Sequence, residues 1–147
     1  MKVFIADDSA LVRDRLIAMI SELPDTEIIG EAQDASEAMS LTQKLKPDVV
    51  ILDIRMPRGN GISLLCNIKK QKPAPLVIML TNYPYPQYRK KCMKEGADFF
   101  FDKSGEFLKV MEVLKKINQK SSPHRKTHIK RRKRTKSGIK RHLSKRC

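Results

Sequence analysis

The chain alternates short apolar runs with longer stretches in which apolar residues recur every three or four positions. The short runs predict strands at residues 2–6, 27–31, 49–52, 76–80 and 99–101. The longer stretches predict helices from Ser9 to about residue 23 and at residues 35–45, 61–72, 84–95 and 106–119. Strands that alternate with helices are typical of a parallel sheet covered on both faces, with short right-handed crossovers.

The third predicted strand carries the strongest signal in the chain. Val49 to Leu52 are four consecutive apolar residues without alternation, a pattern that favours a strand covered on both faces. Asp53 follows at the end of this strand, and Pro57 turns the chain away. A carboxylate in this position costs solvation free energy unless a partner binds it. The neighbours of Asp53 are therefore the first place to look for function.

Other predicted strands also end at residues that could take part in chemistry. The residues that follow the first, third, fourth and fifth strands in this way are Asp7, Asp8, Asp53, Thr81 and Lys103. The end of the second strand, Glu31–Ala32, looks uninformative by comparison. The carboxyl ends of parallel strands share one edge of the sheet, and ligands bind at that edge. We therefore expect these side chains to converge.

The converging residue types suit phosphoryl transfer. Three neighbouring carboxylates raise one another's pKa, and a hard divalent cation such as Mg²⁺ removes that conflict. An aspartate can accept a phosphoryl group, and the charge on the phosphoryl oxygens must then be neutralised by groups such as a lysine ammonium and a threonine hydroxyl. Taken singly, Asp7 could be a cap, Thr81 a turn residue and Lys103 a solvated lysine. The combination favours the functional interpretation.

Several motifs together resemble the receiver domain of two-component response regulators. They are Ile5–Ser9, Leu52–Pro57 through Gly61, Leu80–Thr81, Gly96–Asp98 and Phe101–Lys103. The resemblance covers residues 1–119. It implies an α/β, doubly wound, flavodoxin-like fold with a five-stranded parallel sheet in the order 2-1-3-4-5 and five helices.

The resemblance also assigns roles to the acidic residues. It implies that Asp53 accepts a phosphoryl group from the phosphohistidine of a sensor histidine kinase or a phosphotransfer protein. It implies further that Asp7, Asp8, Asp53 and the backbone carbonyl of Arg55 hold Mg²⁺. By this resemblance the chain is a phosphorelay protein rather than an enzyme.

The switch residues follow from the same resemblance. Thr81 and Lys103 would bind the phosphoryl oxygens, and Phe100 would rotate when Thr81 moves, which changes the surface of the fourth helix, fifth strand and fifth helix. Two positions depart from the family pattern. Ser104 follows Lys103 where proline is common, and Phe100 stands where tyrosine is common.

Individual residues bear on the rate of dephosphorylation and on two alternative function classes. By the same resemblance, Arg55 and Tyr83 occupy positions that tune the access of hydrolytic water. Both are bulky, so we expect slow loss of the phosphoryl group. A phosphatase of the aspartate-nucleophile class would need Asp at position 55. A flavodoxin-type nucleotide site would need a phosphate-binding loop after the first strand, where Asp7 and Asp8 would instead repel phosphate.

The formal net charge of +15 lies mostly at the C-terminal end. Residues 1–119 contain 18 Lys and Arg against 16 Asp and Glu, whereas residues 120–147 contain 13 against none. This difference predicts a receiver domain at 1–119 and a disordered basic tail at 120–147. As an alternative function, the tail binds nucleic acid or another polyanion as the main output, although an anionic membrane surface or an acidic partner is equally permitted.

The remaining signals concern location and assembly. No apolar stretch has the length of a membrane span, and the first apolar run meets Asp7 too early for a signal peptide. The three cysteines are odd in number and lack CxxC spacing, which argues against a disulfide framework or a zinc site. These features predict a cytoplasmic protein, and a homodimer is compatible with the sequence.

Overall fold

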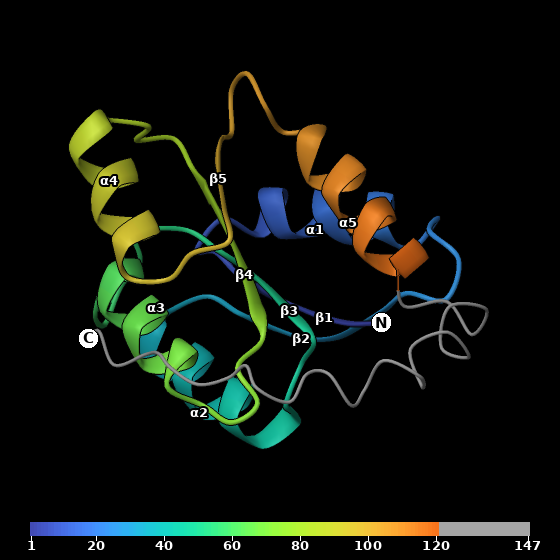
Figure 1. Cartoon of the computed structure of the whole chain (residues 1–147), viewed down its shortest axis with the longest axis horizontal. Helices are drawn as coiled ribbons and strands as arrows, with labels where there is room; N and C mark the ends of the chain where they lie inside the picture. The colour runs from blue at the N-terminus through green and yellow to red at the C-terminus, as the bar shows by residue number, and fades with distance from the viewer. Residues whose placement is uncertain (121–147) are drawn as a thin grey trace, which may run out of the picture.

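The computed structural model describes residues 1–120, which form a five-stranded parallel sheet flanked by helices (Figure 1). The strands are β1 (Lys2–Ala6), β2 (Glu27–Ala32), β3 (Val49–Leu52), β4 (Leu76–Thr81) and β5 (Phe99–Asp102). They pair in the order β2–β1–β3–β4–β5, and every neighbouring pair is parallel. The predicted fold class and strand order are therefore confirmed.

Five helices connect or follow these strands. They are α1 (Ala10–Ile20), α2 (Ala35–Leu45), α3 (Gly61–Lys69), α4 (Pro86–Lys94) and α5 (Lys109–Lys120). The disorder predicted for the basic tail concerns residues 121–147, which lie outside the described residues.

Four of the predicted helix boundaries were wrong by two or three residues. Helix α1 ends at Ile20 instead of about residue 23. Helix α3 ends at Lys69 instead of residue 72, because the residue before Pro73 disfavours helical backbone. Helix α4 begins at Pro86 instead of residue 84, with proline in its first turn, where a missing N–H costs nothing. Helix α5 begins at Lys109 because Phe107 and Leu108 form a turn, closed by the hydrogen bond from the Lys109 amide to the Glu106 carbonyl at 2.9 Å.

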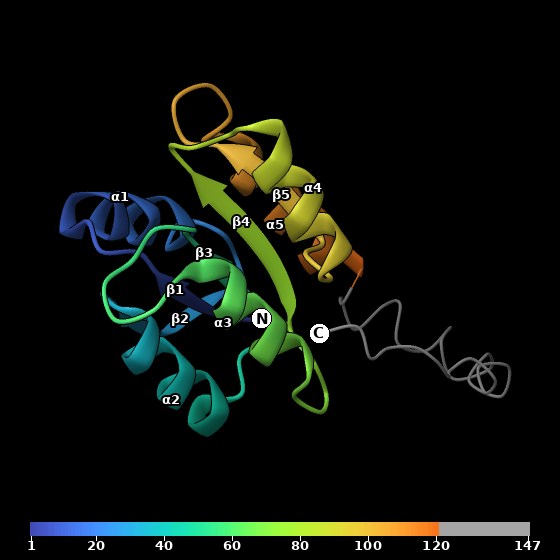
Figure 2. The ribbon, with the colours of Figure 1, turned by 90° about the vertical axis from the view of Figure 1, so that its left-hand side faces the viewer.

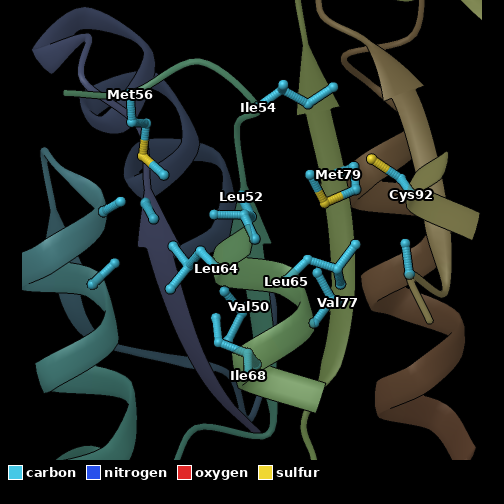
Figure 3. Packing of buried hydrophobic residues seen from close by; sticks show 14 of the residues in the cluster. Val50, Leu52, Ile54, Met56, Leu64, Leu65, Ile68, Val77, Met79 and Cys92 are labelled. Atoms are coloured by element: carbon cyan, nitrogen blue, oxygen red, sulfur yellow. The ribbon is translucent and has the colours of Figure 1, made fainter. Parts of the chain in front are cut away.

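Alternate residues of β3 pack on opposite faces of the sheet. Val50 and Leu52 belong to the core beneath α2, α3 and α4, and Val49 and Ile51 belong to the core beneath α1 and α5. Figure 3 shows Leu64 of α3 among the labelled side chains of the first core. Because both faces are apolar and covered, β3 shows no polar alternation in the sequence.

Capping side chains fix where the helices begin near the carboxyl edge. The hydroxyl of Ser9 accepts from the Val12 amide at 3.2 Å, as the predicted N-cap should. Asn60 caps α3 by accepting from the amides of Ile62 and Ser63 at 3.0 and 2.9 Å. Because β1 pairs with β3, the loops that end at these caps lie beside each other.

The buried thiol of Cys92 should make the stability of the domain depend on pH. Cys92 is fully buried on the inner side of α4, and burial raises the pKa of its thiol to about 11. The folded chain therefore holds this proton more tightly than the unfolded chain, so stability is full below pH 9 and falls between pH 9 and 11. We expect a loss of about 2 kcal/mol from this group. Urea unfolding of Cys92→Val should lack that part of the pH dependence, and parallel curves for the variant and the wild type would contradict this assignment.

Candidate functional site

Three carboxylates meet at the carboxyl edge of the sheet. Asp7 and Asp8 follow β1, and Asp53 follows β3, the strand that pairs with β1. One carboxylate oxygen from each lies within 4.8 Å of the other two. Asp7 and Asp53 are 3% and 4% exposed, whereas Asp8 is exposed. The predicted convergence of the acids is thus observed, and Asp8 opens the cluster to solvent.

The sheet itself holds two of these acids in place. The amide of Asp53 donates to the carbonyl of Ala6 at 3.1 Å, and the amide of Asp7 donates to the carbonyl of Ala32 at 3.1 Å. These bonds continue the parallel ladders one residue past the strand ends. The two buried side chains therefore stand on rigid backbone.

Lys103 joins the two buried acids from the opposite side. Its ammonium lies 2.7 Å from Asp7 Oδ2 and 2.9 Å from Asp53 Oδ2, and its side chain is 8% exposed. Burial alone would lower the pKa of Lys103, but hydrogen bonds and charge attraction from Asp7 and Asp53 outweigh it, so the pKa is raised. One ammonium thus neutralises part of the charge of two carboxylates.

The three acids fit a hard divalent cation. Burial raises the pKa of Asp7, although the hydrogen bond from Lys103 opposes that shift. A buried carboxylate with a raised pKa has anionic charge that its neighbours do not fully satisfy. Oxygen donors at this spacing are the ligands that Mg²⁺ prefers. Asp7, Asp8 and Asp53 would supply them.

Thr81 lies at the end of β4 and is fully buried. Its hydroxyl accepts from the amide of Tyr83 at 3.0 Å, and its carbonyl accepts from the amide of Lys103 at 2.9 Å. The strand end therefore connects the lysine to the loop that leads into α4. The predicted role of Thr81 in binding a phosphoryl oxygen stays a prediction.

Arg55, two residues after Asp53, contacts Tyr83, two residues after Thr81. The guanidinium carbon of Arg55 lies 4.2 Å from the centroid of the Tyr83 ring, within cation–π range. A hydrogen bond to Tyr88 and the electrostatic influence of Tyr83 raise the pKa of Arg55. An isolated antiparallel bridge to Asn60 fixes the loop backbone at Arg55. The metal-binding role of its carbonyl stays a prediction.

Phe100, the predicted switch residue, is buried in the core beneath α4. The guanidinium carbon of Arg89 lies 4.7 Å from its ring centroid, and an Arg89 nitrogen donates to its carbonyl at 3.4 Å. An exposed α4 residue therefore contacts both the ring and the backbone of the predicted switch.

Sequence reasoning missed Arg13 and Glu31. Arg13 of α1 donates to the Asp7 carbonyl at 2.8 Å and pairs with Glu31 Oε1 at 2.8 Å. The interpretation of the second strand end as uninformative was therefore wrong, because Glu31 orients the arginine that holds the backbone of Asp7. The signal lies in the pairing of β1 with β2, which places Glu31 beside Ile5.

The loop after β5 keeps its shape without proline. The amide and hydroxyl of Ser104 both donate to Asp102 Oδ1, at 3.0 and 2.9 Å. The amide of Glu106 donates to the Asp102 carbonyl at 2.8 Å, and Glu106 Oε1 accepts from the Asp102 amide at 3.0 Å. These reciprocal bonds position Lys103 over the acids.

The fold and the acidic cluster define a response regulator receiver. Residues 3–119 match the family described as response regulator receiver domain, and the chain belongs to that family. Aspartate phosphorylation and Mg²⁺ binding at an acidic pocket are standard for this family, and its members interact with histidine kinases or phosphotransfer proteins. Within residues 1–120, no helix combines the length and the apolarity needed to cross a membrane.

Two relatives show how this chain compares with longer proteins. Protein-glutamate methylesterase/protein-glutamine glutaminase 1 of Carboxydothermus hydrogenoformans is 40% identical over 116 residues, which cover 78% of this chain and 34% of that protein. The DNA-binding transcriptional activator DevR/DosR of Mycobacterium tuberculosis is 30% identical over 117 residues, which cover 80% of this chain and 54% of that protein. The chain thus spans about a third to a half of these relatives.

Solved structures give the same family. The response regulator domain of Thermotoga maritima CheB is 35% identical with a TM-score of 0.72, covering 81% of this chain and 94% of that one. A CheX–CheY–BeF3–Mg²⁺ complex from Borrelia burgdorferi is 31% identical with a TM-score of 0.68, covering 78% of this chain and 89% of that one.

Proposed function

We propose that this chain is a phosphorelay receiver that accepts a phosphoryl group on Asp53 and changes its α4–β5–α5 surface in response. The observation that carries the proposal is the Lys103 ammonium held between two buried carboxylates that lie beside an exposed third. We also propose the division into a receiver domain at residues 1–119 and a basic tail at 120–147. Family membership supports a histidine kinase or phosphotransfer protein as donor, and a homodimer stays a prediction.

The residues divide the transfer step between them. A carboxylate oxygen of Asp53 attacks phosphorus, the bond from phosphorus to the donor imidazole nitrogen breaks, and an acyl phosphate forms. The ammonium of Lys103 is close enough to pair with a phosphoryl oxygen at Asp53. The hydroxyl of Thr81, at the end of the neighbouring strand, would donate to another.

Mg²⁺ would be held by Asp7, Asp8, Asp53 and the Arg55 carbonyl, and it would neutralise phosphoryl charge. Arg13 donates to the Asp7 carbonyl and so restrains the backbone of one member of this ligand set. The solved receiver complex that contains BeF3 and Mg²⁺ supports the assignment by similarity.

Two contacts support the α4–β5–α5 surface as the responding element. The Thr81 hydroxyl accepts from the Tyr83 amide, and the Arg89 guanidinium lies over the Phe100 ring. Movement of either switch residue would therefore disturb the loop into α4 or the helix itself. A phosphoryl group shifts the equilibrium between two forms only by its differential affinity for them.

A small-molecule phosphodonor tests the proposal directly. Wild-type protein incubated with acetyl phosphate and Mg²⁺ should gain one phosphoryl group by intact mass spectrometry, and Asp53→Asn should gain none. Asp14→Asn makes the same chemical change at an exposed site on α1 and should behave as wild type. Labelling of Asp53→Asn at the wild-type level would refute the assignment of the acceptor.

The Arg55–Tyr83 contact predicts a long-lived acyl phosphate. We propose that the Arg55 guanidinium and the Tyr83 ring, held together at 4.2 Å, would hinder water from approaching Asp53, so removing both side chains should speed hydrolysis. We expect Arg55→Ala/Tyr83→Ala to lose phosphate about tenfold faster than wild type. Decay can be followed by release of inorganic phosphate. Arg58→Ala, which removes an exposed arginine from the same loop, should leave the rate unchanged. Equal decay of the double variant and the wild type would count against this interpretation.

A further inference from the structure

Charge is distributed unevenly within the described residues. Residues 1–60 contain 7 Lys and Arg against 11 Asp and Glu, whereas residues 61–120 contain 12 against 5. The first half of the domain is therefore net acidic, with a charge of −4, and the second half is net basic, with a charge of +7. Figure 2 shows α4 and α5 of this basic half beyond β4, at the β5 edge of the sheet, where α4 covers one face and α5 covers the other.

Helix α4 is the most basic element of that half. Its cationic residues are Arg89, Lys90, Lys91 and Lys94, and all four are exposed. The neighbouring carboxylate, Glu95, is buried and pairs with Lys91 at 3.1 Å. Lys90 and Lys94 are four residues apart, so they share a helix face, and that face is opposite the buried Cys92. The outward side of α4 is consequently a cationic strip.

An aromatic cluster adjoins the beginning of this strip. The ring centroids of Tyr83 and Tyr85 lie 6.3 Å apart, and those of Tyr85 and Tyr88 lie 5.7 Å apart. Tyr85 is 49% exposed, so one ring of the cluster offers its surface to solvent. Exposed large apolar side chains are normally isolated, whereas this one stands beside two other rings and the lysines of α4.

We propose that Tyr85 and the outward face of α4 bind single-stranded nucleic acid. Proteins that bind single strands combine cations, which follow the phosphate backbone, with aromatic rings on which bases stack. Both features are present within one loop and one helix. The proposal extends the receiver function with a partner class, and it does not require phosphorylation of Asp53 for the binding itself.

The narrow apolar exposure of α4 favours this occupant over an anionic membrane. A membrane-bound helix needs a broad apolar face, but Met93 is the only large apolar residue of α4 that is exposed. The basic composition of residues 121–147, with 12 Lys and Arg and no acid, adds charge of the same sign to the chain. A polyanion with stackable bases uses both the charge and the ring.

The proposed binding site is also connected to the phosphorylation site, through Thr81. This part of the inference rests on the proposed function. The Tyr83 amide donates to the Thr81 hydroxyl at 3.0 Å, and Tyr83 begins the aromatic cluster. If Thr81 turns toward a phosphoryl group, it gives up this hydrogen bond. The position of the cluster would then change, so phosphorylation would change the affinity for the strand.

The tyrosines provide a local probe. The chain has no tryptophan, and its three tyrosines are the members of this cluster. Stacking of a base on Tyr85 should therefore quench the whole-protein tyrosine fluorescence. Titration of the full chain with oligo(U) should give saturable quenching, corrected for absorbance with N-acetyltyrosinamide. Polyphosphate, a polyanion without bases, should bind without comparable quenching.

Two variants separate α4 from the rest of the chain. Lys90→Gln/Lys94→Gln should lower the slope of log affinity against log salt by about 1.4, because two phosphate contacts are lost. Tyr85→Leu should weaken oligo(U) binding about tenfold and reduce the quenching, because the stacked ring is lost. Lys2→Gln/Lys44→Gln removes two exposed lysines from the other half of the domain and should leave both quantities unchanged.

Three results would overturn the proposal. One is absence of oligo(U) binding, and another is binding with unchanged affinity and quenching in both Lys90→Gln/Lys94→Gln and Tyr85→Leu. The third is loss of binding to phosphatidylserine vesicles, but not to oligo(U), in Lys90→Gln/Lys94→Gln. The titrations use unphosphorylated chain and are repeated with Asp53→Asn. A failure of nucleic-acid binding is therefore distinct from a failure of phosphoryl transfer.

Discussion

Replacement of Lys103 by methionine is expected to destabilise the metal-free protein by about 3 kcal/mol and to make its stability strongly dependent on Mg²⁺. The ammonium lies 2.7 Å from Asp7 and 2.9 Å from Asp53, and all three groups are almost fully buried. Removing one partner of a buried ion pair leaves an uncompensated buried charge, which costs several kcal/mol. A divalent cation would replace the lost positive charge, so added Mg²⁺ should stabilise the variant more than the wild type.

Urea unfolding followed by circular dichroism measures both effects, with EDTA or with Mg²⁺. Lys109→Met is the matched control, because Lys109 pairs with Glu106 at 3.0 Å on the surface. An exposed pair of this kind contributes roughly 1 kcal/mol or less. Equal stability of Lys103→Met and wild type in EDTA would show that the two buried acids do not depend on the ammonium.

The stability of Lys103→Met should also depend on pH differently from that of the wild type. Burial already raises the pKa of Asp7, and loss of the Lys103 hydrogen bond removes a cause that lowers it. When the pKa of a group is higher in the folded than in the unfolded state, its contribution to stability is complete at low pH and is lost as the pH rises. The stability deficit of Lys103→Met relative to wild type should therefore shrink as the pH falls from 7 toward 5.

The site was predictable because parallel strands place their ends at one edge. A buried run followed by Asp53, with acids after the first strand and Lys103 after the fifth, fixes which side chains meet once the order of the strands is known. The apolar run at Val49–Leu52 gave the central strand its position. These are contacts that the backbone arrangement determines, so a pattern of residues is enough to predict them.

Contacts between side chains of different elements could not be predicted from the sequence. The strand register places Glu31 beside Ile5, but only the rotamer of Arg13 takes its guanidinium to both Glu31 and the Asp7 carbonyl. The stacking of Arg55 on Tyr83 likewise depends on two loop conformations that no periodicity encodes. Helix ends shifted because turn residues and prolines compete locally with helical hydrogen bonding.

The aromatic and basic features of α4 show a related limit. The sequence places four cations in the fourth helix but does not say which of them face solvent. Packing of Cys92 against the sheet sets the rotation of the helix, and that rotation turns Lys90 and Lys94 outward. Residues 1–119 are nearly neutral in sum, so composition alone does not reveal this basic surface of the folded domain.

Replacement of Gly61 by alanine is expected to cost at least about 3 kcal/mol and to impair the phosphoryl acceptor. A Cβ at this position would overlap the carbonyl oxygen of Asp53 and lie 2.7 Å from the Cα of Ile54. Both neighbours are backbone atoms that follow a central strand, so neither can move without displacing the loop. The Gly61 amide also donates to the Ile54 carbonyl at 2.6 Å, which holds the beginning of α3 against this loop.

Gly105→Ala and Gly30→Ala complete the comparison. The nearest atom to a Cβ at Gly105 is a side-chain oxygen of Asp102 at 3.9 Å. The free energy of unfolding of Gly105→Ala should therefore lie within about 0.5 kcal/mol of the wild-type value. At Gly30 the nearest atom is Leu45 Cδ1 at 2.9 Å, a side-chain atom that can shift, so an intermediate loss is expected. Urea unfolding ranks the stabilities of the three variants, and labelling with acetyl phosphate measures how well Asp53 still accepts a phosphoryl group. The clash at Gly61 is with the backbone of Asp53 itself. Of the three variants, only Gly61→Ala should therefore lose both stability and phosphoryl labelling. Wild-type values of both quantities in Gly61→Ala would mean that the loop after β3 adjusts freely.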